Sequence, residues 1–337
     1  MAAVFTIYTA FDRPDLLSAL DHSDHPLNQL WPEFLDQDLT FQFFSRFLTR
    51  LKPLARFQFL AVETDPATGN ESVIGLARSI PFFWPDIATI QSVDSVSLSQ
   101  NPKILQSLPD GGYDTILARG VQQCLAREGQ LKEPLALTLD QLQDSAICRC
   151  QDPPNAMSAL SITVHPERRK TGLAEVFIRK MKETAVSEQL QALVVPLRPT
   201  RKCEYPHMDM SSYINWPVTD GCPVTNRAMR PVRTMCMQGA NLPFDPWLRK
   251  HLRLGGKVIK VAKNSMTVRG TDAEWRQWTD VNFEDLAKLS PGCLEGNDYI
   301  DVIIPSGLVP VQYSRQEKIG IYKEPNVWIL HELGKIE

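Results

Sequence analysis

The chain has 337 residues and a net charge of −3, with 36 basic and 39 acidic side chains. Hydrophobic residues make up 43% of it and charged residues 22%, which is the ordinary balance of a globular protein that buries a sizeable core. Since no basic field would draw in nucleic acid, we expect no nucleic-acid partner.

Compartment and metal content are inferred from the apolar segments and the cysteines. The N-terminus carries no secretory signal, and the most apolar runs, at 192–197 and 302–311, are far shorter than a membrane span, so no membrane partner is expected. Seven cysteines without a framework spacing favour reduced thiols and a cytoplasmic location. Cys148 and Cys150 have no second pair at zinc-site spacing, so we interpret them as ordinary thiols and expect no metal.

Two helical patterns come first along the chain. Residues 14–20 follow Asp12, which is a candidate helix cap. Residues 41–51 repeat apolar side chains at helical spacing, with Asp38 ahead of them as a cap and Pro53 after them as a stop.

A hairpin and a second helical region follow. Apolar runs at 57–63 and 73–80 enclose a polar loop, which predicts a β-hairpin. The aromatic residues 82–84 either belong to the core or line an acceptor pocket, and the core interpretation is favoured. Turn chemistry alone accounts for Asp110 and Asp114, which flank a Gly-Gly pair ahead of a predicted helix at 115–127.

The next segment predicts a strand, a helix and a strand in succession. Residues 158–164 are rich in β-branched side chains, and Pro166 ends that strand. An apolar stripe from Leu173 to about residue 190 predicts an amphipathic helix. Residues 193–197 are wholly apolar, as in a strand that is buried on both faces.

Regularity stops after this strand and returns near the C-terminus. Residues 199–250 are rich in proline and read as a long ordered loop with a flexible insertion at about 217–240. Strand character resumes at 257–268, 308–312 and 327–331. The insertion is either a docking loop for a partner or a solvated, variable loop.

The junction between the strand at 158–164 and the following helix has the features of a phosphate-binding turn. The first turn of a helix has backbone N–H groups without partners and a partial positive charge. Gly172 and Ala174 leave room for a diphosphate to approach, and Arg169 and Lys170 add formal positive charge. A Walker A motif and a G-x-G-x-x-G fingerprint are both absent.

The pattern Arg169-x-x-Gly172-x-Ala174 after a strand ending in Val-His-Pro resembles the signature turn of the GCN5-related N-acetyltransferase superfamily. The clear resemblance covers about residues 155–200. It implies one α/β domain over 1–337, with a mixed, mostly antiparallel sheet flanked by helices and interrupted by long irregular insertions. The motif core would span about 155–200, the substrate-side segment 199–250 and the C-terminal strands 257–331.

The resemblance also implies an acyl-CoA co-substrate, such as acetyl-CoA, and a place for it. In that fold the motif strand and the next strand splay apart, and the pantetheine arm lies between them. Backbone groups of Ile162, Thr163 and Val164 would pair with the arm, and one N–H would face the thioester oxygen. The diphosphate would contact the signature turn, whose residues are Arg169, Lys170, Thr171, Gly172, Leu173 and Ala174.

Acyl transfer to an amine further requires a base for the ammonium proton and an acid for the leaving thiolate. The strand at 158–164 has no carboxylate. Tyr205 is the preferred acid and Tyr213 the second choice, while a structural role is favoured for His165. Singly, each of the polar residues of the irregular segment is better explained as a loop hydrogen-bonder or a solvated charge; they are Glu204, His207, Asp245 and His251.

Three functional hypotheses remain from the sequence. The first is an acyl-CoA-dependent N-acyltransferase for a small-molecule amine. The second keeps the fold but hydrolyses, decarboxylates or rearranges an acyl substrate. The third is a CoA-binding regulatory protein without catalysis.

Overall fold

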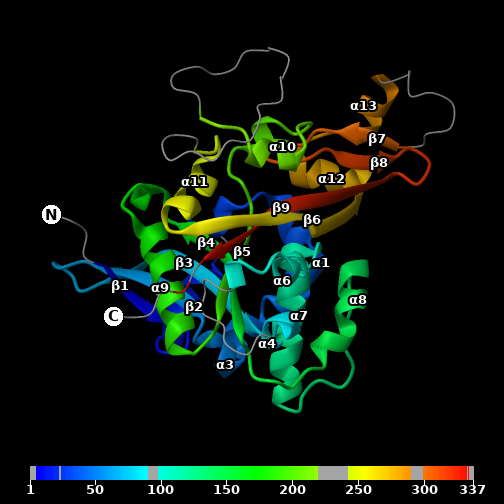
Figure 1. The fold of residues 1–337 in the computed structure, drawn as a ribbon. Coiled ribbons are helices and arrows are strands. Elements are labelled where there is room, and N and C mark those ends of the chain that lie inside the picture. Colours follow the sequence, from blue (N-terminus) through cyan, green and yellow to red (C-terminus); the bar gives the residue numbers. More distant parts are fainter. Residues whose placement is uncertain are drawn as a thin grey trace.

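The computed structural model describes residues 5–22, 24–89, 98–218, 242–289, 299–331 and 333, and its centre is a nine-stranded sheet (Figure 1). The order is β1-β2-β3-β4-β5-β9-β8-β7, with β6 pairing β9 outside this path. Paired strands are antiparallel except β4 and β5, which confirms the expected mixed sheet. The strands β1 to β9 span Phe5–Thr9, Gln58–Thr64, Glu71–Phe82, Ala156–Val164, Ala192–Leu197, Gly256–Thr271, Tyr299–Val302, Val311–Ser314 and Ile319–His331.

Helices cover both faces of this sheet. The α-helices are α1 Leu39–Phe44, α2 Phe47–Arg50, α3 Lys52–Ala55, α4 Pro85–Ala88, α6 Pro102–Gln106, α7 Gly112–Arg127, α8 Leu139–Cys148, α9 Leu173–Ser187, α10 Met210–Ile214, α11 Pro246–Arg253, α12 Asp272–Thr279 and α13 Phe283–Leu289. The 3-10 helices are η1 Pro14–Asp21, η2 Asn28–Leu30, η3 Glu33–Gln37, η4 Pro166–Arg168 and η5 Lys202–Glu204.

The central feature of the sheet is the separation of β4 from β5. The two strands pair only at Ala156, Met157 and Ser158 of β4. Beyond that point β4 continues along β3 and β5 continues along β9, so a gap opens between them. The register of β4 on β3 shifts between Ala159 and Ser161, just where the strands part. A bulge bends a strand and increases its twist, which gives the separation a local cause.

Helices α9 and α7 pack on opposite faces of the sheet, which we call the α9 face and the α7 face (Figure 1). Phe177 and three other buried residues of α9 form the predicted apolar stripe. Two glycines permit the close packing. A Cβ at Gly75 of β3 would meet Phe177 at 2.9 Å, and one at Gly120 of α7 would meet Ile80 at 2.6 Å.

The hairpin, the two strands around α9 and the helix at 115–127 are confirmed, while some helix boundaries differ. Asp38 caps α1 as predicted, accepting from Phe41 N–H at 2.7 Å. Asp12 caps nothing, because its carboxylate accepts from the Thr9 hydroxyl at 2.6 Å and η1 has no side-chain cap. Pro53 lies in the first turn of α3, where a missing N–H is tolerated, so it does not act as a stop.

The C-terminal strands are confirmed at 257–268 and 327–331, but β8 begins at Val311 and not at residue 308. The reason is that Leu308 is held outside the ladder, with its N–H donating to the Tyr322 hydroxyl at 2.9 Å. Phe82 and Trp84 are fully buried and stacked, which supports the core interpretation. Most of the predicted insertion at 217–240 lies outside the described residues.

Candidate functional site

The turn before α9 leaves open space at the helix N-terminus. Gly172 is the N-cap, with a φ of +85°, a left-handed conformation that favours glycine. A Cβ built there would meet no atom within 4 Å. Lys170 also has a positive φ, of +66°, and the Thr171 hydroxyl donates to the Arg168 carbonyl at 2.7 Å, which closes the turn. The predicted cradle is therefore an open, sharply folded turn.

The donors of this turn are unused. In the described part of the chain, the backbone N–H groups of residues 171–174 meet no acceptor. Arg169 and Lys170 are exposed and form no ion pair with a described residue, whereas Arg168 is turned away to Glu63 at 2.6 Å. Leu173 is buried in the core, so only its backbone is available to a ligand. Four N–H groups and two cations are thus left for an anion.

One acidic residue lies in the first turn of α9. Glu175 pairs with Lys250 of α11 at 2.7 Å. The hydrogen bond from Lys250 lowers the pKa of Glu175, so this carboxylate is ionised and its charge is offset. The pair attaches α11 to the start of α9 and leaves the positive end of the helix in place.

The gap beside β4 offers backbone groups from alternate residues. In an antiparallel pair, alternate residues direct both backbone groups to the same neighbour. His165 N–H donates to the directly opposite Ile74 carbonyl at 2.8 Å, so Thr163 also faces β3. The backbone groups of Ile162 and Val164 therefore point into the gap. Of the three predicted contacts on this strand, the structure favours these two.

Tyr205 lies on the α9 face, shortly after β5. Its ring packs edge-on against Trp216 and Phe244, with centroids 4.8 and 5.7 Å away. The buried Lys202 ammonium donates to the Tyr205 carbonyl at 2.8 Å and to the Leu308 carbonyl at 2.7 Å, and burial lowers the pKa of Lys202 to about 8. The Tyr205 hydroxyl makes no hydrogen bond to a described residue, so it is available to a ligand.

Tyr213, the second candidate acid, has a structural partner instead. Its hydroxyl donates to the buried Asp245 carboxylate at 3.0 Å. Asp245 also caps α11 by accepting from Trp247 N–H at 2.9 Å and Leu248 N–H at 3.0 Å. The structural interpretation of Asp245 is supported, and the hydroxyl of Tyr213 is committed to the fold.

The histidines near the site are also engaged within the protein. His165 caps η4 by accepting from Glu167 N–H at 3.3 Å, in line with its expected structural role. His251 and His331 are buried with ring nitrogens 2.8 Å apart. Burial lowers the pKa of His251 to about 3 and that of His331 to about 4, so both rings are neutral near pH 7. Among the other two candidates, Glu204 pairs with Arg201 at 2.6 Å and His207 is exposed.

The α7 face holds buried acids that the sequence analysis did not single out. Asp114 Oδ2 accepts from Thr267 N–H at 3.2 Å, and the same N–H lies 3.1 Å from Asp38 Oδ2. Burial, followed by the charge of Asp38, raises the pKa of Asp114 well above its usual range. The expectation that turn chemistry accounts for Asp114 is wrong, because the side chain is fully buried against β6. Asp110 stays at the surface of the turn and pairs with Lys260 at 2.9 Å.

A second buried acid on the α7 face fixes the far side of the gap. Arg198, directly after β5, donates through Nε to both carboxylate oxygens of Glu324 at 2.9 and 3.0 Å. Tyr322 donates to the same carboxylate at 2.6 Å and Asn326 at 3.2 Å. These bonds hold the end of β5 against β9 where β4 has moved away.

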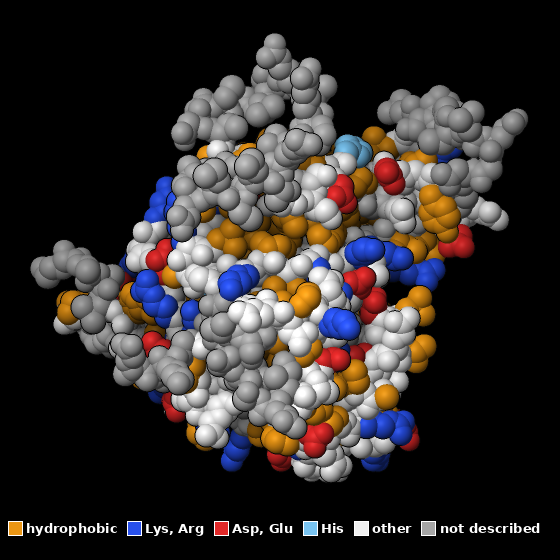
Figure 2. Space-filling view, viewed as in Figure 1, with side chains coloured by type: hydrophobic (Ala, Val, Ile, Leu, Met, Phe, Trp, Pro, Cys, Tyr) orange, Lys and Arg blue, Asp and Glu red, His pale blue; other side chains and the backbone are white. Residues whose placement is uncertain are grey.

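The described residues contain no group of three or more His, Cys, Asp and Glu side chains that would hold a metal. Among them, no helix combines the length and the apolar character needed to cross a bilayer. On the face shown in Figure 2, Lys and Arg side chains alternate with acidic and neutral ones and do not gather into one field.

Comparisons with known proteins place the chain in a family, although no family model matches it. It is 30% identical over 329 residues to the arginine N-acetyltransferase avaD of Aspergillus versicolor, covering 98% of this chain and 94% of that protein. Two solved structures have the same extent at 12% identity. The loading GNATL domain of CurA from Lyngbya majuscula covers 98% of both chains with a TM-score of 0.41. The GphF GNAT-like decarboxylase in complex with isobutyryl-CoA covers 98% of this chain and 100% of its own, with a TM-score of 0.39.

The 30% identity extends over nearly the whole of both proteins, and the residues it includes form the signature turn and the splayed strands described above. The chain therefore belongs to the GCN5-related N-acetyltransferase superfamily and is an acyl-CoA-dependent N-acyltransferase.

Proposed function

We propose that this enzyme, which acylates a small-molecule amine, transfers an acetyl group from acetyl-CoA to a nitrogen of a free amino acid of the arginine type. The observation that carries the proposal is the gap between β4 and β5, which lies beside the unoccupied donors at the start of α9. The choice of acceptor is supported by the relative avaD, which is named as an arginine N-acetyltransferase.

The cofactor would be held mainly by backbone groups. The diphosphate would accept from the N–H groups of residues 171–174, with Arg169 and Lys170 adding charge-assisted contacts. The pantetheine arm would pair with the backbone of Ile162 and Val164 in the gap. Because α9 and the cofactor would occupy one face, the acceptor amine would reach the thioester from the α7 face.

The chemistry is direct attack of the neutral amine on the thioester carbonyl. A backbone N–H of Ile162 or Val164 would stabilise the tetrahedral oxyanion, and such a donor contributes roughly 3 kcal/mol in other acyl-transfer sites. Collapse breaks the C–S bond, and Tyr205 would donate its proton to the leaving thiolate. The nitrogen would release its surplus proton as the amide forms, and that proton restores the phenol. Since β4 carries no carboxylate, we propose that solvent takes the ammonium proton before attack.

The setting that fits this reaction is the cytoplasm, with no nucleic-acid or membrane partner. The proposed co-substrate, acetyl-CoA, is an intracellular metabolite. Four cysteines are free thiols, as is usual in a reducing compartment; they are Cys124, Cys148, Cys150 and Cys203. The mixed charge on the face shown in Figure 2 agrees with a small-molecule acceptor.

The test is release of free CoA from acetyl-CoA across a panel of amines that includes arginine, with mass spectrometry of the acceptor. We expect CoA release to depend on the amine and to match the amount of acetylated product. CoA release without an acetylated acceptor would instead support hydrolysis on the same fold. Binding of acetyl-CoA without any turnover on the panel would contradict the proposal and favour a regulatory CoA-binding role.

A further inference from the structure

An arginine on the α7 face lies one strand away from the gap. Arg78 is part of β3, directly opposite Gln58 of β2 on one side and Ser161 of β4 on the other. Opposed residues of paired strands have side chains on the same face. Ser161 belongs to the part of β4 that has left β5, so Arg78 stands beside the edge of the gap from which the acceptor would approach.

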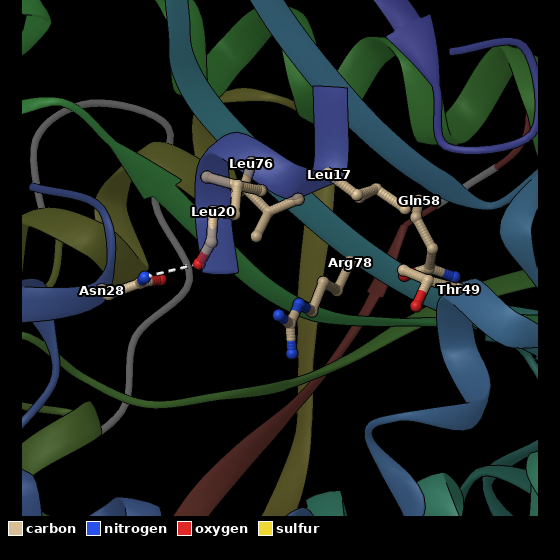
Figure 3. A pocket seen from close by; sticks show the side chains of 7 residues that line it. All are labelled: Leu17, Leu20, Asn28, Thr49, Gln58, Leu76 and Arg78. Carbon is tan, nitrogen blue, oxygen red and sulfur yellow. Dashed lines mark hydrogen bonds between the residues drawn. The ribbon is translucent and has the colours of Figure 1, made fainter. Parts of the chain in front are cut away.

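The Arg78 side chain lines a pocket of about 130 Å³, room for about four water molecules. The other lining residues come from η1, η2, α2, β2 and β3, and they are Leu17, Leu20, Asn28, Thr49, Gln58 and Leu76. In Figure 3 the Arg78 side chain extends between Asn28 on one side and Gln58 and Thr49 on the other. The pocket is thus lined by three leucines, three uncharged polar side chains and one cation.

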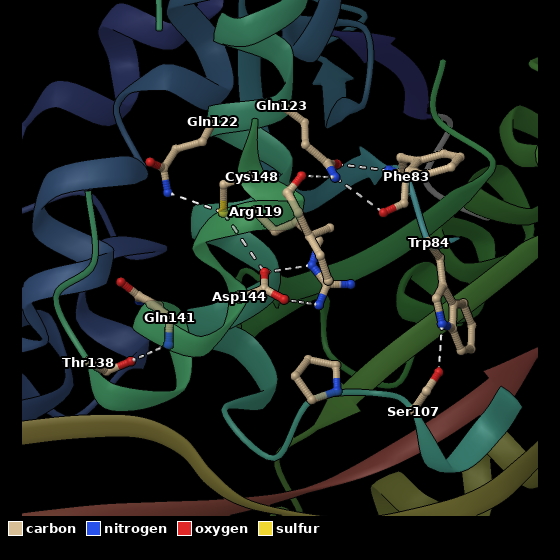
Figure 4. A network of polar contacts seen from close by, with 12 residues as sticks. Phe83, Trp84, Ser107, Arg119, Gln122, Gln123, Thr138, Gln141, Asp144 and Cys148 are labelled. Carbon is tan, nitrogen blue, oxygen red and sulfur yellow. Dashed lines mark hydrogen bonds and ion pairs between the residues drawn. The ribbon is translucent and has the colours of Figure 1, made fainter. Parts of the chain in front are cut away.

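The guanidinium of Arg78 makes no hydrogen bond or ion pair with any described residue. Two other interior arginines differ from it in this respect. Arg119 pairs with Asp144 across α7 and α8 at 2.8 Å (Figure 4), and Arg198 pairs with Glu324 at 2.9 Å. Arg78 is half-buried, and a cation that loses part of its hydration without gaining a partner is unfavourable. Burial accordingly lowers the pKa of Arg78 from its usual value.

Within the described ranges, no acid forms an ion pair with Arg78. Tyr113 and Asp36 are the groups whose charges act on Arg78, and neither forms an ion pair with it. The fork of a guanidinium matches a carboxylate in two parallel hydrogen bonds. An anionic ligand group of that shape would supply the missing partner.

A polar residue beside Arg78 is held in place within the protein. The Gln58 amide nitrogen donates to the Leu54 and Ser79 carbonyls, both at 2.8 Å, which fixes the orientation of the amide. Its Oε1 atom is shielded from solvent, so it does not face the pocket. The pocket therefore offers one cation, the Arg78 guanidinium, to a carboxylate.

We propose that the Arg78 pocket binds the α-carboxylate of the acceptor and selects free amino acids over their decarboxylated or amidated analogues. This inference deepens the proposed function and rests on it. The methylene groups of the acceptor would pack against Leu17, Leu20 and Leu76.

The test compares arginine with agmatine, which lacks the carboxylate, and with argininamide, in which a neutral amide replaces it. For the wild type we expect kcat/KM to be about 30- to 100-fold higher for arginine, the range of a charge-assisted hydrogen-bond pair. Arg78→Leu, which keeps part of the apolar stem, is expected to lower the arginine value to that of agmatine and to leave agmatine unchanged. Arg78→Lys is expected to fall between the two, because it keeps the charge and loses the fork.

The controls separate this inference from the proposed function. Arg149→Leu removes an exposed arginine of the α8 end and should change none of the three values. CoA affinity should be the same in Arg78→Leu and the wild type; a selective loss of CoA affinity would show that Arg78 binds a cofactor phosphate. An equal loss for all three acceptors would indicate a purely structural arginine and overturn the inference. If no acceptor is acetylated, calorimetry of arginine and agmatine with the CoA-loaded protein still tests the pocket. Binding of arginine but not agmatine that is lost in Arg78→Leu would support it. Arginine binding that does not depend on Arg78, or no arginine binding, would contradict it.

Discussion

The two proposed binding regions recognise anionic groups by different means. The turn before α9 uses main-chain N–H groups from four consecutive residues, placed by one glycine in a left-handed conformation. The Arg78 pocket uses one guanidinium surrounded by side chains from five separate elements. A main-chain site is built by local geometry and tolerates many side chains, whereas a side-chain pocket depends on how distant elements pack. The three predictions below test the main-chain site, the acid that would serve it and a buried carboxyl of the α7 face, in order of expected effect.

The largest effect is expected from Gly172→Asp. The new carboxylate would enter the open space at the helix N-terminus, where it would block and repel a diphosphate. We expect calorimetry to show CoA and acetyl-CoA binding weakened by more than about 100-fold, the loss of several charge-assisted hydrogen bonds.

Gly129→Asp is the matched control for this change. Gly129 also has a positive φ, of +68°, and also has no atom within 4 Å of an added Cβ, but it lies after α7, away from the turn. Both variants carry the same backbone strain, so only the first should lose the cofactor. Unchanged CoA binding by Gly172→Asp would remove the basis for placing the diphosphate at α9.

A smaller effect is expected from Tyr205→Phe, which tests whether an acid from the segment after β5 serves the main-chain site. We expect kcat to fall about 100-fold, the lower end for loss of a general acid, with the KM for acetyl-CoA unchanged. Tyr213→Phe should leave kcat unaltered and lower stability, because its hydroxyl bonds to Asp245. Equal kcat values for the two variants would make Tyr205 a loop anchor.

The smallest effect concerns the buried carboxyls beneath α7. The fold raises the pKa of Asp114, so its protonated form is favoured and the stability this gives is present below about pH 4 and lost as pH rises towards the folded pKa. Relative to Asp114→Asn, the wild type should therefore lose up to about 1.4 kcal/mol of unfolding free energy per pH unit above that point. Urea denaturation between pH 4 and 8 measures this difference. Asp110→Asn, on the same turn, should give a curve parallel to the wild type.

The sequence predicted the main-chain region well, because everything that defines it is local. A β-branched run, a His-Pro pair and the small residues Gly172 and Ala174 lie within twenty residues, and the strand, turn and helix formed as expected. The sequence could not show that the backbone groups of Thr163 face β3 and not the gap. Which residues of β4 face β3 depends on the residues of β3 that lie opposite them.

The α7 face was largely missed for the same physical reason. Asp114 sits in a typical turn sequence, and only the packing of α7 on β6 reveals that its carboxylate is buried. For Arg78 the sequence did hold one signal, a single cation within the mostly apolar run at 73–80. A charge at such a position needs a partner, but the sequence does not show whether the protein supplies one.

The three residue pairs that join β4 to β5 also have a mechanical meaning. Strands β1–β4 and strands β5–β9 are each joined by antiparallel pairing, and the short β4–β5 seam divides the sheet into these two parts. Helices α9 and α7 each contact strands on both sides of the seam, so they hold the two parts of the sheet together. We therefore expect the amide hydrogens on the two sides of the seam to exchange as two cooperative units. The gap between β4 and β5 can widen while each half of the sheet stays folded.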